Sequence, residues 1–593
     1  FEDDSDDILN SLKNRGPDFQ NFYQINNLVF FHSLLKIMDL SENSVQPMID
    51  QKTGNVIIFN GEIYNYNEIR KKYFPDSIFK SDTDTEVILK TYELFGNKVI
   101  EHLKGMFVFA IYDNKTKKVI IFRDTYGIKP LYYSSLKNNF FFSSDIKTLL
   151  KFKKVKEEIE LNEKIVVSFI GNRQLFKNNE TLFKNIKILP KSSIIEIDTS
   201  TKKFSISKYK SNFKQFDNKN YQNFESLFLK NLDDHILTKH DKIACFLSGG
   251  LDSSLLASSL SKIKTNKKIY TFTALQKDLF ESDNAKKINE IQKFNPTYIN
   301  TEDINFFDEL EKVNKINFQP SVDLSVIVHK KLCEEVRKKN IKIIFSGNGA
   351  DEIFCGYPSH IYSYFAYNFK KNYNIFKLIN KILSFKKTNA KSFLDILKGT
   401  FVQILPLKLI NYIKKIQLKK KVSHLNISKV NIQNLNFYDE HDLEKFKNVK
   451  KNYMDSWALQ NYLDYEDKNS MYYGIEIRVP YLDIELEKII NNYSLESFFS
   501  EGSKSHLRKI SFLPDIIAKE KRKSGFAGDL NLFYEKYYKQ ILYKIENDFN
   551  DIPLINNKKL RDMFKNLKLE NSEIFFRTFS YGIWYLNCFK EDE

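Results

Sequence analysis

A pair of glycines between two apolar runs sets the strongest limit on how this chain folds. Gly249 and Gly250 follow the apolar residues 243–247 and precede the apolar residues 255–257. This order predicts a strand, a tight turn and a helix. Glycine lets the backbone approach a ligand closely, and a helix N-terminus offers unpaired N–H groups and the positive end of a dipole, so we expect the turn to bind a phosphate. The Walker pattern is missing and the turn contains no lysine, which argues against ordinary γ-phosphoryl transfer.

The residues of this turn resemble the pyrophosphate loop of ATP pyrophosphatases, because they read Ser-Gly-Gly-x-Asp-Ser-Ser. A bare Ser-Gly-Gly turn can be structural, but the full string between a strand and a helix indicates an ATP site. The resemblance implies that the loop holds the β,γ-pyrophosphate while a nucleophile attacks the α-phosphorus, so that AMP and pyrophosphate leave. It also implies that Asp252 helps to hold Mg²⁺, which prefers hard oxygen ligands. The ATP site predicted from this stretch comprises Leu247, Ser248, Gly249, Gly250, Asp252, Ser253 and Ser254, with Leu275 just beyond the next predicted strand at 268–273.

The composition indicates a folded protein with more than one core. With 593 residues, about two or three domains are expected, and 42% hydrophobic residues argue against disorder. The net charge of +17 suggests nucleic acid, but the lysines are spread along the whole chain without a nucleic-acid motif, so we interpret them as a solvated surface. The cysteines are scattered, which predicts neither disulfides nor a zinc site and fits a reducing cytoplasm. No apolar run reaches roughly 18 residues and the start is acidic, so we expect no membrane segment and no signal peptide.

The first 205 residues contain short apolar runs that are bounded by Asn, Asp and Gly. This spacing predicts an antiparallel β-rich layer with a few helices, the clearest at about 85–94. The distinctive motifs follow one another at 14–18, 59–66, 81–87, 104–113 and 123–133. Taken singly, each motif also fits a hairpin with a structural Asn-Gly turn.

Together and in this order, these motifs resemble the glutaminase domain of class II glutamine amidotransferases. The resemblance implies an N-terminal-nucleophile fold, an αββα sandwich with two β-sheets between helices. In that family an N-terminal Cys attacks the glutamine amide with its own α-amine as the base, because a free amine titrates near neutrality. The backbone amide of residues 60–61 is implied as the oxyanion hole. The implied glutamine pocket comprises Asn60, Gly61, Glu62 and Asp84, of which Asp84 binds the glutamine α-amino group.

This sequence departs from that pattern at two points. It begins at Phe1 and has no Cys before Cys245, so we expect that the given sequence lacks the first residues of the family pattern; a truly absent nucleophile is the alternative. Leu34 falls on the position of an Arg that binds the glutamine carboxylate. Because leucine forms no bidentate ion pair, the use of glutamine stays open.

From about residue 206 the chain alternates strands and helices, which predicts a doubly wound parallel α/β sheet with the nucleotide at the carboxyl ends of its strands. Residues 281–283 resemble a turn of the synthetase family after the second of these strands. A second glycine-rich turn follows the apolar residues 343–345, and we predict that Ser346 and Gly347 in this turn belong to the ATP site.

Two carboxylates follow the second turn, and we predict that both are catalytic. Asp351 and Glu352 lie at a strand end where ligands of such sheets bind. Helix capping is the alternative role for Asp351. Because Asp252 lies at a neighbouring strand end, we favour paired ligation of Mg²⁺ by Asp252 and Asp351.

Asn348 lies in the second turn, in a segment that closely resembles asparagine synthetases. Those enzymes carry an acidic residue at this position, which contacts the substrate amine and is a candidate base for the incoming ammonia. Asn forms hydrogen bonds but cannot take that proton. We therefore predict that Asn348 faces the substrate, and the substitution weakens the case for aspartate.

The last part of the chain contains a helical insertion at about 359–452 and a candidate catalytic lysine. Contact with a membrane surface is one interpretation of the insertion, and a solvated helical insertion is the one we favour. Lys504 is our candidate for the cation that neutralises charge on the α-phosphate and the leaving pyrophosphate. A surface lysine before a helix is the alternative.

The resemblance spans nearly the whole chain and names the family of glutamine-dependent asparagine synthetases. It implies an α/β fold, α+β overall, with a glutaminase domain at 1–205 and an ATP-pyrophosphatase-type synthetase domain at 206–593. It further implies ATP and Mg²⁺ as cofactors, small-molecule substrates, a homodimer, and conversion of L-aspartate to L-asparagine through an acyl-AMP with ammonia passed inside the protein.

Three alternatives remain open. A related amidotransferase acting on another carboxylate such as a sugar acid is favoured by Asn348, and an ammonia-dependent synthetase is favoured by Leu34 and by the missing Cys. A nucleotide-binding regulatory protein is disfavoured, because degeneration should have removed some of the residues Asp252, Asp351, Glu352 and Lys504.

Overall fold

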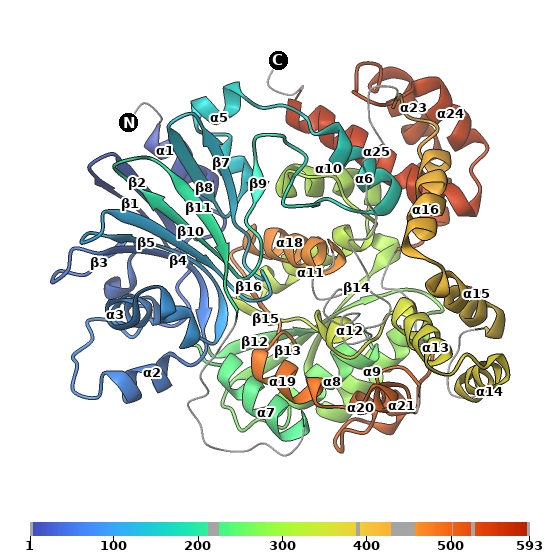
Figure 1. Ribbon diagram of the computed structural model, residues 1–593, viewed down its shortest axis with the longest axis horizontal. Coiled ribbons are helices and arrows are strands. Elements are labelled where there is room, and N and C mark those ends of the chain that lie inside the picture. Colours follow the sequence, from blue (N-terminus) through green and yellow to red (C-terminus); the bar gives the residue numbers. More distant parts are fainter. Residues whose placement is uncertain are drawn as a thin grey trace.

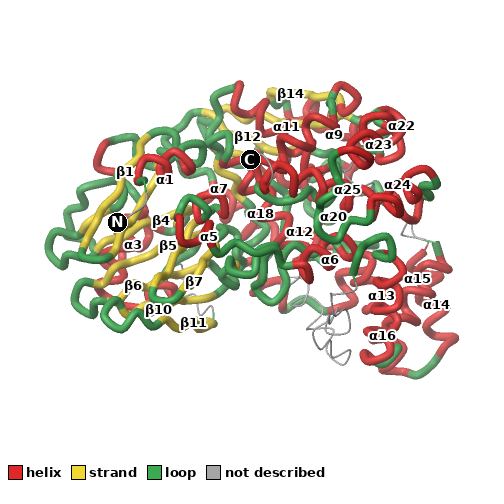
Figure 2. Tube along the Cα trace, turned by 90° about the horizontal axis from the view of Figure 1, so that it is seen from above, coloured by secondary structure: helices red, strands yellow, loops and turns green. Residues whose placement is uncertain are grey.

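The computed structural model describes residues 4–210, 224–386, 392–427, 457–500, 502–522 and 528–589. Figure 1 shows a β-rich first half and a second half built around a parallel sheet. Viewed from above in Figure 2, most strands gather at the end of the molecule that holds the N-terminus, and most helices gather at the other end. We call residues 4–210 the first half and residues 224–589 the second half.

The first half is a layered αββα arrangement. Its main sheet is antiparallel, six-stranded and ordered β11-β10-β6-β5-β4-β3. These strands are β3 (Met48–Ile49), β4 (Val56–Ile63), β5 (Gly105–Asp113), β6 (Lys118–Arg123), β10 (Ser193–Asp198) and β11 (Phe204–Lys208). The second layer holds the hairpin of β1 (Phe19–Ile25) and β2 (Leu28–Leu34) and a sheet of β7 (Tyr132–Leu136), β8 (Asn139–Ser143) and β9 (Lys187–Ile188).

Strand β5 explains why the layers stack in this way. Its side chains alternate between two apolar clusters, because successive residues of a strand point to opposite faces. Phe107 and Phe109 face the cluster that contains residues of α3 (Asp84–Phe95), whereas Val108 and Ala110 face the cluster shared with β2 and β7. The outer helices are α2 (Tyr66–Tyr73) and α3 on one side and α1 (Ser5–Leu12) and α4 (Ile146–Leu149) on the other. The predicted sandwich and the helix predicted at 85–94 are confirmed.

The second half contains a five-stranded sheet in the order β14-β13-β12-β15-β16, and every neighbouring pair is parallel. The strands are β12 (Lys242–Phe246), β13 (Lys268–Leu275), β14 (Asn295–Asn300), β15 (Ile343–Phe345) and β16 (Glu476–Arg478). Helices α8 (Leu251–Leu260) and α9 (Phe280–Gln292) pack on one face, with α7 (Phe224–His235) beside α8. Helices α11 (Ser325–Lys338) and α18 (Trp457–Met471) pack on the other face, and α10 (Phe306–Asn317) packs on these two helices (Figure 1). The doubly wound sheet is therefore confirmed, and its strand order reverses between β12 and β15, where ligands of such sheets bind.

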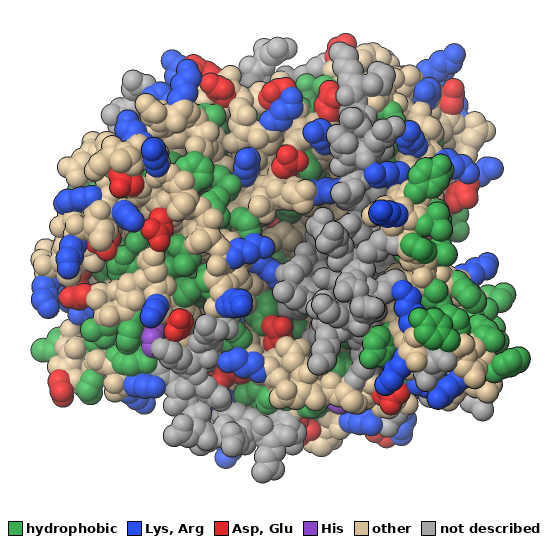
Figure 3. All heavy atoms as spheres, in the orientation of Figure 1, with side chains coloured by type: hydrophobic (Ala, Val, Ile, Leu, Met, Phe, Trp, Pro, Cys, Tyr) green, Lys and Arg blue, Asp and Glu red, His purple; other side chains and the backbone are tan. Residues whose placement is uncertain are grey.

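The predicted insertion is mostly helical in its described part. It comprises α13 (Pro358–Asn372), α14 (Ile375–Lys386), α15 (Phe393–Ile404) and α16 (Leu407–Lys421), and its predicted parts 387–391 and 428–452 lie outside the described residues. Figure 3 shows hydrophobic side chains gathered at the edge of the molecule that these helices form, and Phe376, Leu394 and Phe401 are among the exposed ones. In the part of the chain that is described, no helix has the length and apolarity needed to cross a membrane.

The remaining helices lie around these sheets. They are α5 (Lys153–Glu157), α6 (Glu163–Asn172), α12 (Ala350–Ile353), α19 (Ile484–Asn491), α20 (Ser505–Arg508), α21 (Asp515–Ala518), α22 (Leu530–Lys536), α23 (Tyr538–Asn547), α24 (Asn557–Lys565) and α25 (Leu569–Phe589). Helix α6 of the first half packs on α25, and Arg577 Nε donates to the carbonyl of Ile170 at 2.7 Å. The predicted boundary at residues 205 and 206 lies inside β11, so the first sheet continues to Lys208.

Buried ion pairs join the two halves. Arg15 Nη2 lies 2.8 Å from Asp467 Oδ2 on α18, and Lys104 Nζ lies 2.7 Å from Glu485 Oε2 on α19. Such pairs contribute little net stability when intact, but removing one partner leaves an uncompensated buried charge. The contact between the halves is therefore sensitive to single charge deletions.

Candidate functional site

The predicted strand, turn and helix at 246–254 are present. Strand β12 ends at Phe246, Gly250 is the N-cap of α8, and Gly249 has a φ of 81°. A Cβ on Gly249 would lie 1.9 Å from the carbonyl oxygen of Glu281, so only glycine fits there. Inside the turn, Ser248 Oγ and Ser253 Oγ are 2.9 Å apart. The turn thus presents the start of α8, with its N–H groups, at the carboxyl edge of the sheet.

The other residues predicted for ATP differ in what they can offer a ligand. Leu247 is buried, its N–H donates to Phe272 O at 3.0 Å and its carbonyl accepts from Thr273 Oγ1 at 2.7 Å. Ser254 is also fully buried, in the body of α8, and Leu275 is the last residue of β13. Ser248, Gly250 and Asp252 are partly exposed and remain the groups of this loop that a ligand can reach.

Residues 281–283 do not form the predicted turn. They lie in the first turn of α9, which begins at Phe280. Ser282 Oγ accepts from the N–H of Gln276 at 3.0 Å and so ties the helix start to the end of β13. The segment follows β13, as the resemblance implies, but its local structure is helical.

The second glycine-rich turn lies directly beside the first. Ser346 and Gly347 follow β15, and a Cβ on Gly347 would come within 3.4 Å of Ser253 N and 3.6 Å of Asp252. The N–H of Asn348 donates to Ser346 Oγ at 3.3 Å. The structure therefore brings the two predicted loops together at the point where the strand order reverses.

Lys504 joins the two predicted metal-binding carboxylates. Its Nζ lies 2.5 Å from Asp252 Oδ2 and 2.6 Å from Asp351 Oδ1, and its side chain is 5% exposed. Burial alone would lower the pKa of Lys504, but the two carboxylates outweigh burial, and the pKa is raised. The ammonium is therefore held charged between two carboxylates, which excludes the alternative of a solvated surface lysine.

The same cluster has donors that fit a magnesium ion. Asp252 Oδ1 is buried and has no hydrogen-bond partner among the described residues. Within the described ranges no group of three or more His, Cys, Asp or Glu side chains is placed to hold a metal. Two carboxylates suit Mg²⁺, because this ion usually keeps waters and takes substrate phosphates as its other ligands.

Glu352 lies on α12 and faces Tyr357 instead of Lys504. Its Oε1 accepts from Tyr357 Oη at 2.7 Å. Burial and the neighbouring charge of Asp351 raise the pKa of Glu352 to about 7. This carboxyl can therefore hold or release a proton near neutrality.

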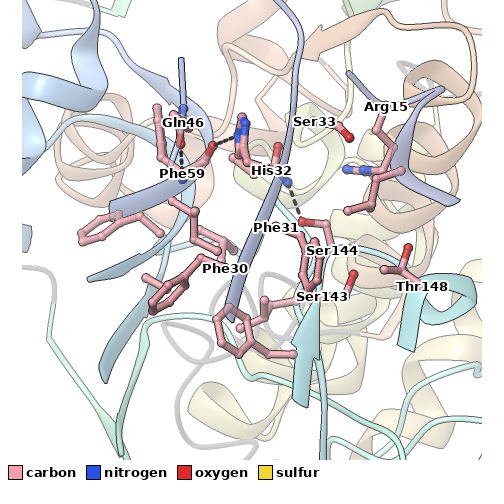
Figure 4. A pocket seen from close by; sticks show the side chains of 18 of the residues that line it. Arg15, Phe30, Phe31, His32, Ser33, Gln46, Phe59, Ser143, Ser144 and Thr148 are labelled. Atoms are coloured by element: carbon pink, nitrogen blue, oxygen red, sulfur yellow. Dashed lines mark hydrogen bonds between the residues drawn. The ribbon is translucent and has the colours of Figure 1, made fainter. Parts of the chain in front are cut away.

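The residues predicted for glutamine surround a cavity of about 550 Å³ in the first half. Asn60 Nδ2 donates to Ser144 Oγ at 3.1 Å. Gly61 has a φ of 148°, and a Cβ at this position would clash, because it would lie 2.1 Å from the carbonyl oxygen of Met106. Figure 4 shows His32 and Gln46 on either side of Phe59, whose backbone they bind. Leu34 lines the same cavity as Asn60, Gly61, Glu62 and Asp84, so the structure brings the predicted pocket together.

Two buried carboxyls of this pocket carry shifted pKa values. Glu62 Oε2 lies 3.0 Å from Arg478 Nη2 of β16, yet burial outweighs this cation and raises the pKa of Glu62 well above its usual value. Asp84 Oδ2 accepts from the N–H of Ile63 at 2.9 Å, and burial raises the pKa of Asp84 to about 7. Glu62 of this pocket is thus paired with a cation from the second half.

Comparison with protein families assigns both halves. Residues 2–210 match the family described as glutamine amidotransferase domain, and residues 224–587 match the family described as asparagine synthase. The chain belongs to the asparagine synthase family. The predicted family is therefore confirmed, together with the glutamine amidotransferase domain in front of it.

Curated relatives with the name asparagine synthetase agree with this family assignment. A putative asparagine synthetase [glutamine-hydrolyzing] 2 of Methanocaldococcus jannaschii is 28% identical over 66% of this chain and 80% of its own length. Asparagine synthetase [glutamine-hydrolyzing] 1 of Bacillus subtilis is 30% identical over 58% of this chain, and the match spans about half, 54%, of that relative. Asparagine synthetase [glutamine-hydrolyzing] 3 of the same organism is 26% identical over 94% of this chain and 90% of its own length.

Three residues contact the predicted site residues although the sequence motifs gave them no role. Tyr357 binds Glu352, Arg478 pairs with Glu62, and Glu466 accepts from Ser346 Oγ at 2.7 Å. Helix α18, which carries Glu466, has buried polar residues around its whole circumference, and such a helix is typical of a bridge between two bodies. The burial of these polar residues is a property of the fold, so no sequence signal marks Glu466, Arg478 or Tyr357.

Proposed function

We propose that this chain converts a carboxylate to an amide through an acyl-adenylate, with release of AMP and pyrophosphate, and that its substrate is L-aspartate. The observation that carries the proposal is Lys504, buried between Asp252 and Asp351 beside two glycine-rich loops. An ammonium at a strand-end nucleotide site suits the charge that develops on an α-phosphate and on leaving pyrophosphate. Membership of the asparagine synthase family supports the same chemistry.

The residues of the second half have separate tasks in this proposal. The turn at Gly249 and Gly250 and the start of α8 bind the β,γ-phosphates through backbone N–H groups. Asp252 and Asp351 would hold Mg²⁺, which when bound neutralises phosphate charge. Lys504 then orients the α-phosphate while the substrate carboxylate attacks it, and it stays close to the leaving group because both carboxylates hold its ammonium.

The first half would supply the nitrogen from glutamine. Asn60 and Gly61 provide the oxyanion hole, while Asp84, when ionised, binds the α-amino group. Glu62 lines the same cavity and is held by Arg478. Leu34 offers no charge for the glutamine carboxylate, so this observation favours ammonium as a second nitrogen source.

Asn348 supports a second candidate substrate. An amide in the second loop cannot take a proton from the attacking amine, and it recognises a different set of polar groups from those that a carboxylate recognises. A related amidotransferase that acts on another carboxylate, such as a sugar acid, is therefore the runner-up. A nucleotide-binding regulatory protein would bind ATP and release no AMP.

The test uses the native full-length protein with ATP and Mg²⁺, and it follows AMP and pyrophosphate with and without aspartate. Each mixture contains either glutamine or ammonium. We expect aspartate-dependent AMP with both nitrogen donors, and loss of AMP in the Asp252→Asn variant. AMP formation with ammonium but not with glutamine would contradict the proposed glutaminase step. AMP formation that does not depend on aspartate would contradict aspartate as the substrate. Unchanged AMP formation by Asp252→Asn would overturn the adenylation site.

A further inference from the structure

Glu466 is a buried carboxyl that faces the second glycine-rich loop and has a free oxygen. It lies on α18, and its Oε1 accepts from Ser346 Oγ at 2.7 Å. The same hydroxyl accepts from the N–H of Asn348 at 3.3 Å, so Glu466 and Asn348 meet at one side chain. Glu466 Oε2 is buried and has no hydrogen-bond partner among the described residues. A buried carboxylate oxygen without a partner is costly, and this one lies where a substrate is expected.

Asp252 and Asp351, the two carboxylates beside Lys504, have a partner that makes them poor proton acceptors. Asp252 and Asp351 both contact the ammonium of Lys504, and protonation of either carboxylate would break an ion pair. Glu352 already accepts from Tyr357. Glu466 faces a hydroxyl, an amide and an imidazole, and none of these carries a positive charge that would hold it ionised.

Amide formation from an acyl-adenylate needs a proton acceptor. The lone pair of the amine nitrogen forms the C–N bond, the bond between the acyl carbon and the AMP oxygen breaks, and AMP leaves with that electron pair. The nitrogen then carries one proton too many and must lose it before a neutral amide results. A positioned base typically contributes about 10²- to 10⁴-fold to such a step.

We propose that Glu466 Oε2 accepts this proton from the attacking nitrogen, and that Asn348 holds that nitrogen beside it. The inference rests on the proposed function. Asn348 lies at the position where the asparagine synthetases that this segment resembles carry an acidic residue. Glu466 on the neighbouring helix α18 therefore supplies the carboxylate that the loop lacks. The protonated Glu466 afterwards releases its proton to solvent, which returns the site to its starting state.

The surroundings of Glu466 suit a base that works near neutrality. Burial raises the pKa of Glu466 to about 7, while the Ser346 hydroxyl and the Asn348 amide act in the opposite direction. From α11, His329 Nε2 lies 3.8 Å from Glu466 Oε1, and burial lowers the pKa of His329 to about 4, so this ring is neutral at pH 7. Burial also raises the pKa of Cys333, so its thiol is neutral too. Asp467 and Lys468 follow Glu466 on α18, and they are paired with Arg15 and Asp464, respectively.

The test compares two partial reactions in wild type and Glu466→Gln, with Glu302→Gln at an exposed position as the matched control. Aspartate-dependent exchange of labelled pyrophosphate into ATP reports adenylation, and asparagine formation from ammonium reports the amine step. We expect Glu466→Gln to lower asparagine formation about 100-fold or more while exchange stays within about twofold. Hydroxylamine, a nucleophile that loses its proton more readily than ammonia, should recover much of the lost rate.

A second variant separates loss of the base from loss of the fold, because a carboxylate returned from the loop can recover the amine step only in a folded protein. The double variant Asn348→Glu with Glu466→Gln returns a carboxylate to the same place from the loop, and we expect it to recover at least tenfold over the single variant. Equal loss of exchange and asparagine formation in Glu466→Gln, or no loss at all, would overturn the role of Glu466 alone. A wild-type protein without aspartate-dependent exchange would instead overturn the proposed function, and the inference with it.

Discussion

The nucleotide site of the second half and the glutamine pocket of the first half balance their buried charges in different ways. Asp252 and Asp351 share the ammonium of Lys504, which comes from the same half. In the glutamine pocket Glu62 takes its cation, Arg478, from the second half, and Leu34 places no charge at its own position in the cavity wall. The comparison teaches that the charges of the nucleotide site are balanced within the second half, whereas the charge of Glu62 in the glutamine pocket is balanced across the contact between the halves.

The largest effect is expected from Lys504→Gln. Loss of the ammonium leaves Asp252 and Asp351 as adjacent uncompensated carboxylates and removes the group that faces the phosphates. We expect pyrophosphate exchange to fall by about 10³-fold. Lys519→Gln is the matched control, because the Lys519 side chain is 76% exposed. Exchange that persists in Lys504→Gln would break the claim that the nucleotide site is organised by its own cation.

Next in size is the effect of Arg478→Met on stability. This change leaves Glu62 and Glu476 buried without their shared cation, and we expect it to lower the free energy of unfolding in urea by about 3–5 kcal/mol. Arg337→Met, at an exposed position of α11, should change it by less than about 0.5 kcal/mol. If both variants have the same free energy of unfolding, the pair between Arg478 and Glu62 does not stabilise the contact between the halves. The contrast between the two sites would then disappear.

A smaller effect is expected when the missing charge is returned to the glutamine pocket. Leu34→Arg in the full-length chain should tighten glutamine binding, measured by calorimetry, about tenfold, because a charge-assisted pair forms with the glutamine carboxylate. Leu40→Arg, at a half-exposed position, is the control and should leave binding unchanged. If Leu34→Arg leaves the affinity for glutamine unchanged, either another residue binds the glutamine carboxylate or the pocket binds a different ligand.

The smallest predicted effect is a pH dependence of glutamine binding. The pKa of Asp84 is raised to about 7, so the carboxylate that would bind the α-amino group is mostly protonated below that pH and ionised above it. Affinity should therefore rise with pH, by about fourfold between roughly pH 6.5 and 8. Calorimetry on wild type and Asp84→Asn checks this, since the variant should bind weakly and without that slope. A flat wild-type profile would show that Asp84 does not carry the contact.

Short-range patterns predicted much of this molecule. The strand, turn and helix around Gly249 follow from neighbouring residues, and the alternation of strands with helices gives the parallel sheet. The sheet then brings Asp252 and Asp351 together, because carboxyl ends of parallel strands share one edge. Lys504 could be proposed from its motif, but its position between both carboxylates needed the structure.

Contacts between segments far apart in the chain could not be predicted. The pairing of Glu62 with Arg478 depends on how the two halves pack, and no local pattern encodes that packing. Residues 281–283 were expected in a turn because a resemblance locates a segment without fixing its backbone, and α9 begins one residue earlier. Glu466 remained without a role because a buried carboxyl on a helix is defined by its neighbours, Ser346 and His329, which lie on other elements.

One isotope measurement tests the central claim most directly. Aspartate with ¹⁸O in its side-chain carboxylate is incubated with the full-length protein, ATP, Mg²⁺ and ammonium, and the AMP is analysed by mass spectrometry. An acyl-adenylate requires that one carboxylate oxygen leaves with AMP, so we predict one ¹⁸O in the phosphate of each AMP formed with asparagine. AMP without ¹⁸O, or label in inorganic phosphate instead, would contradict the account.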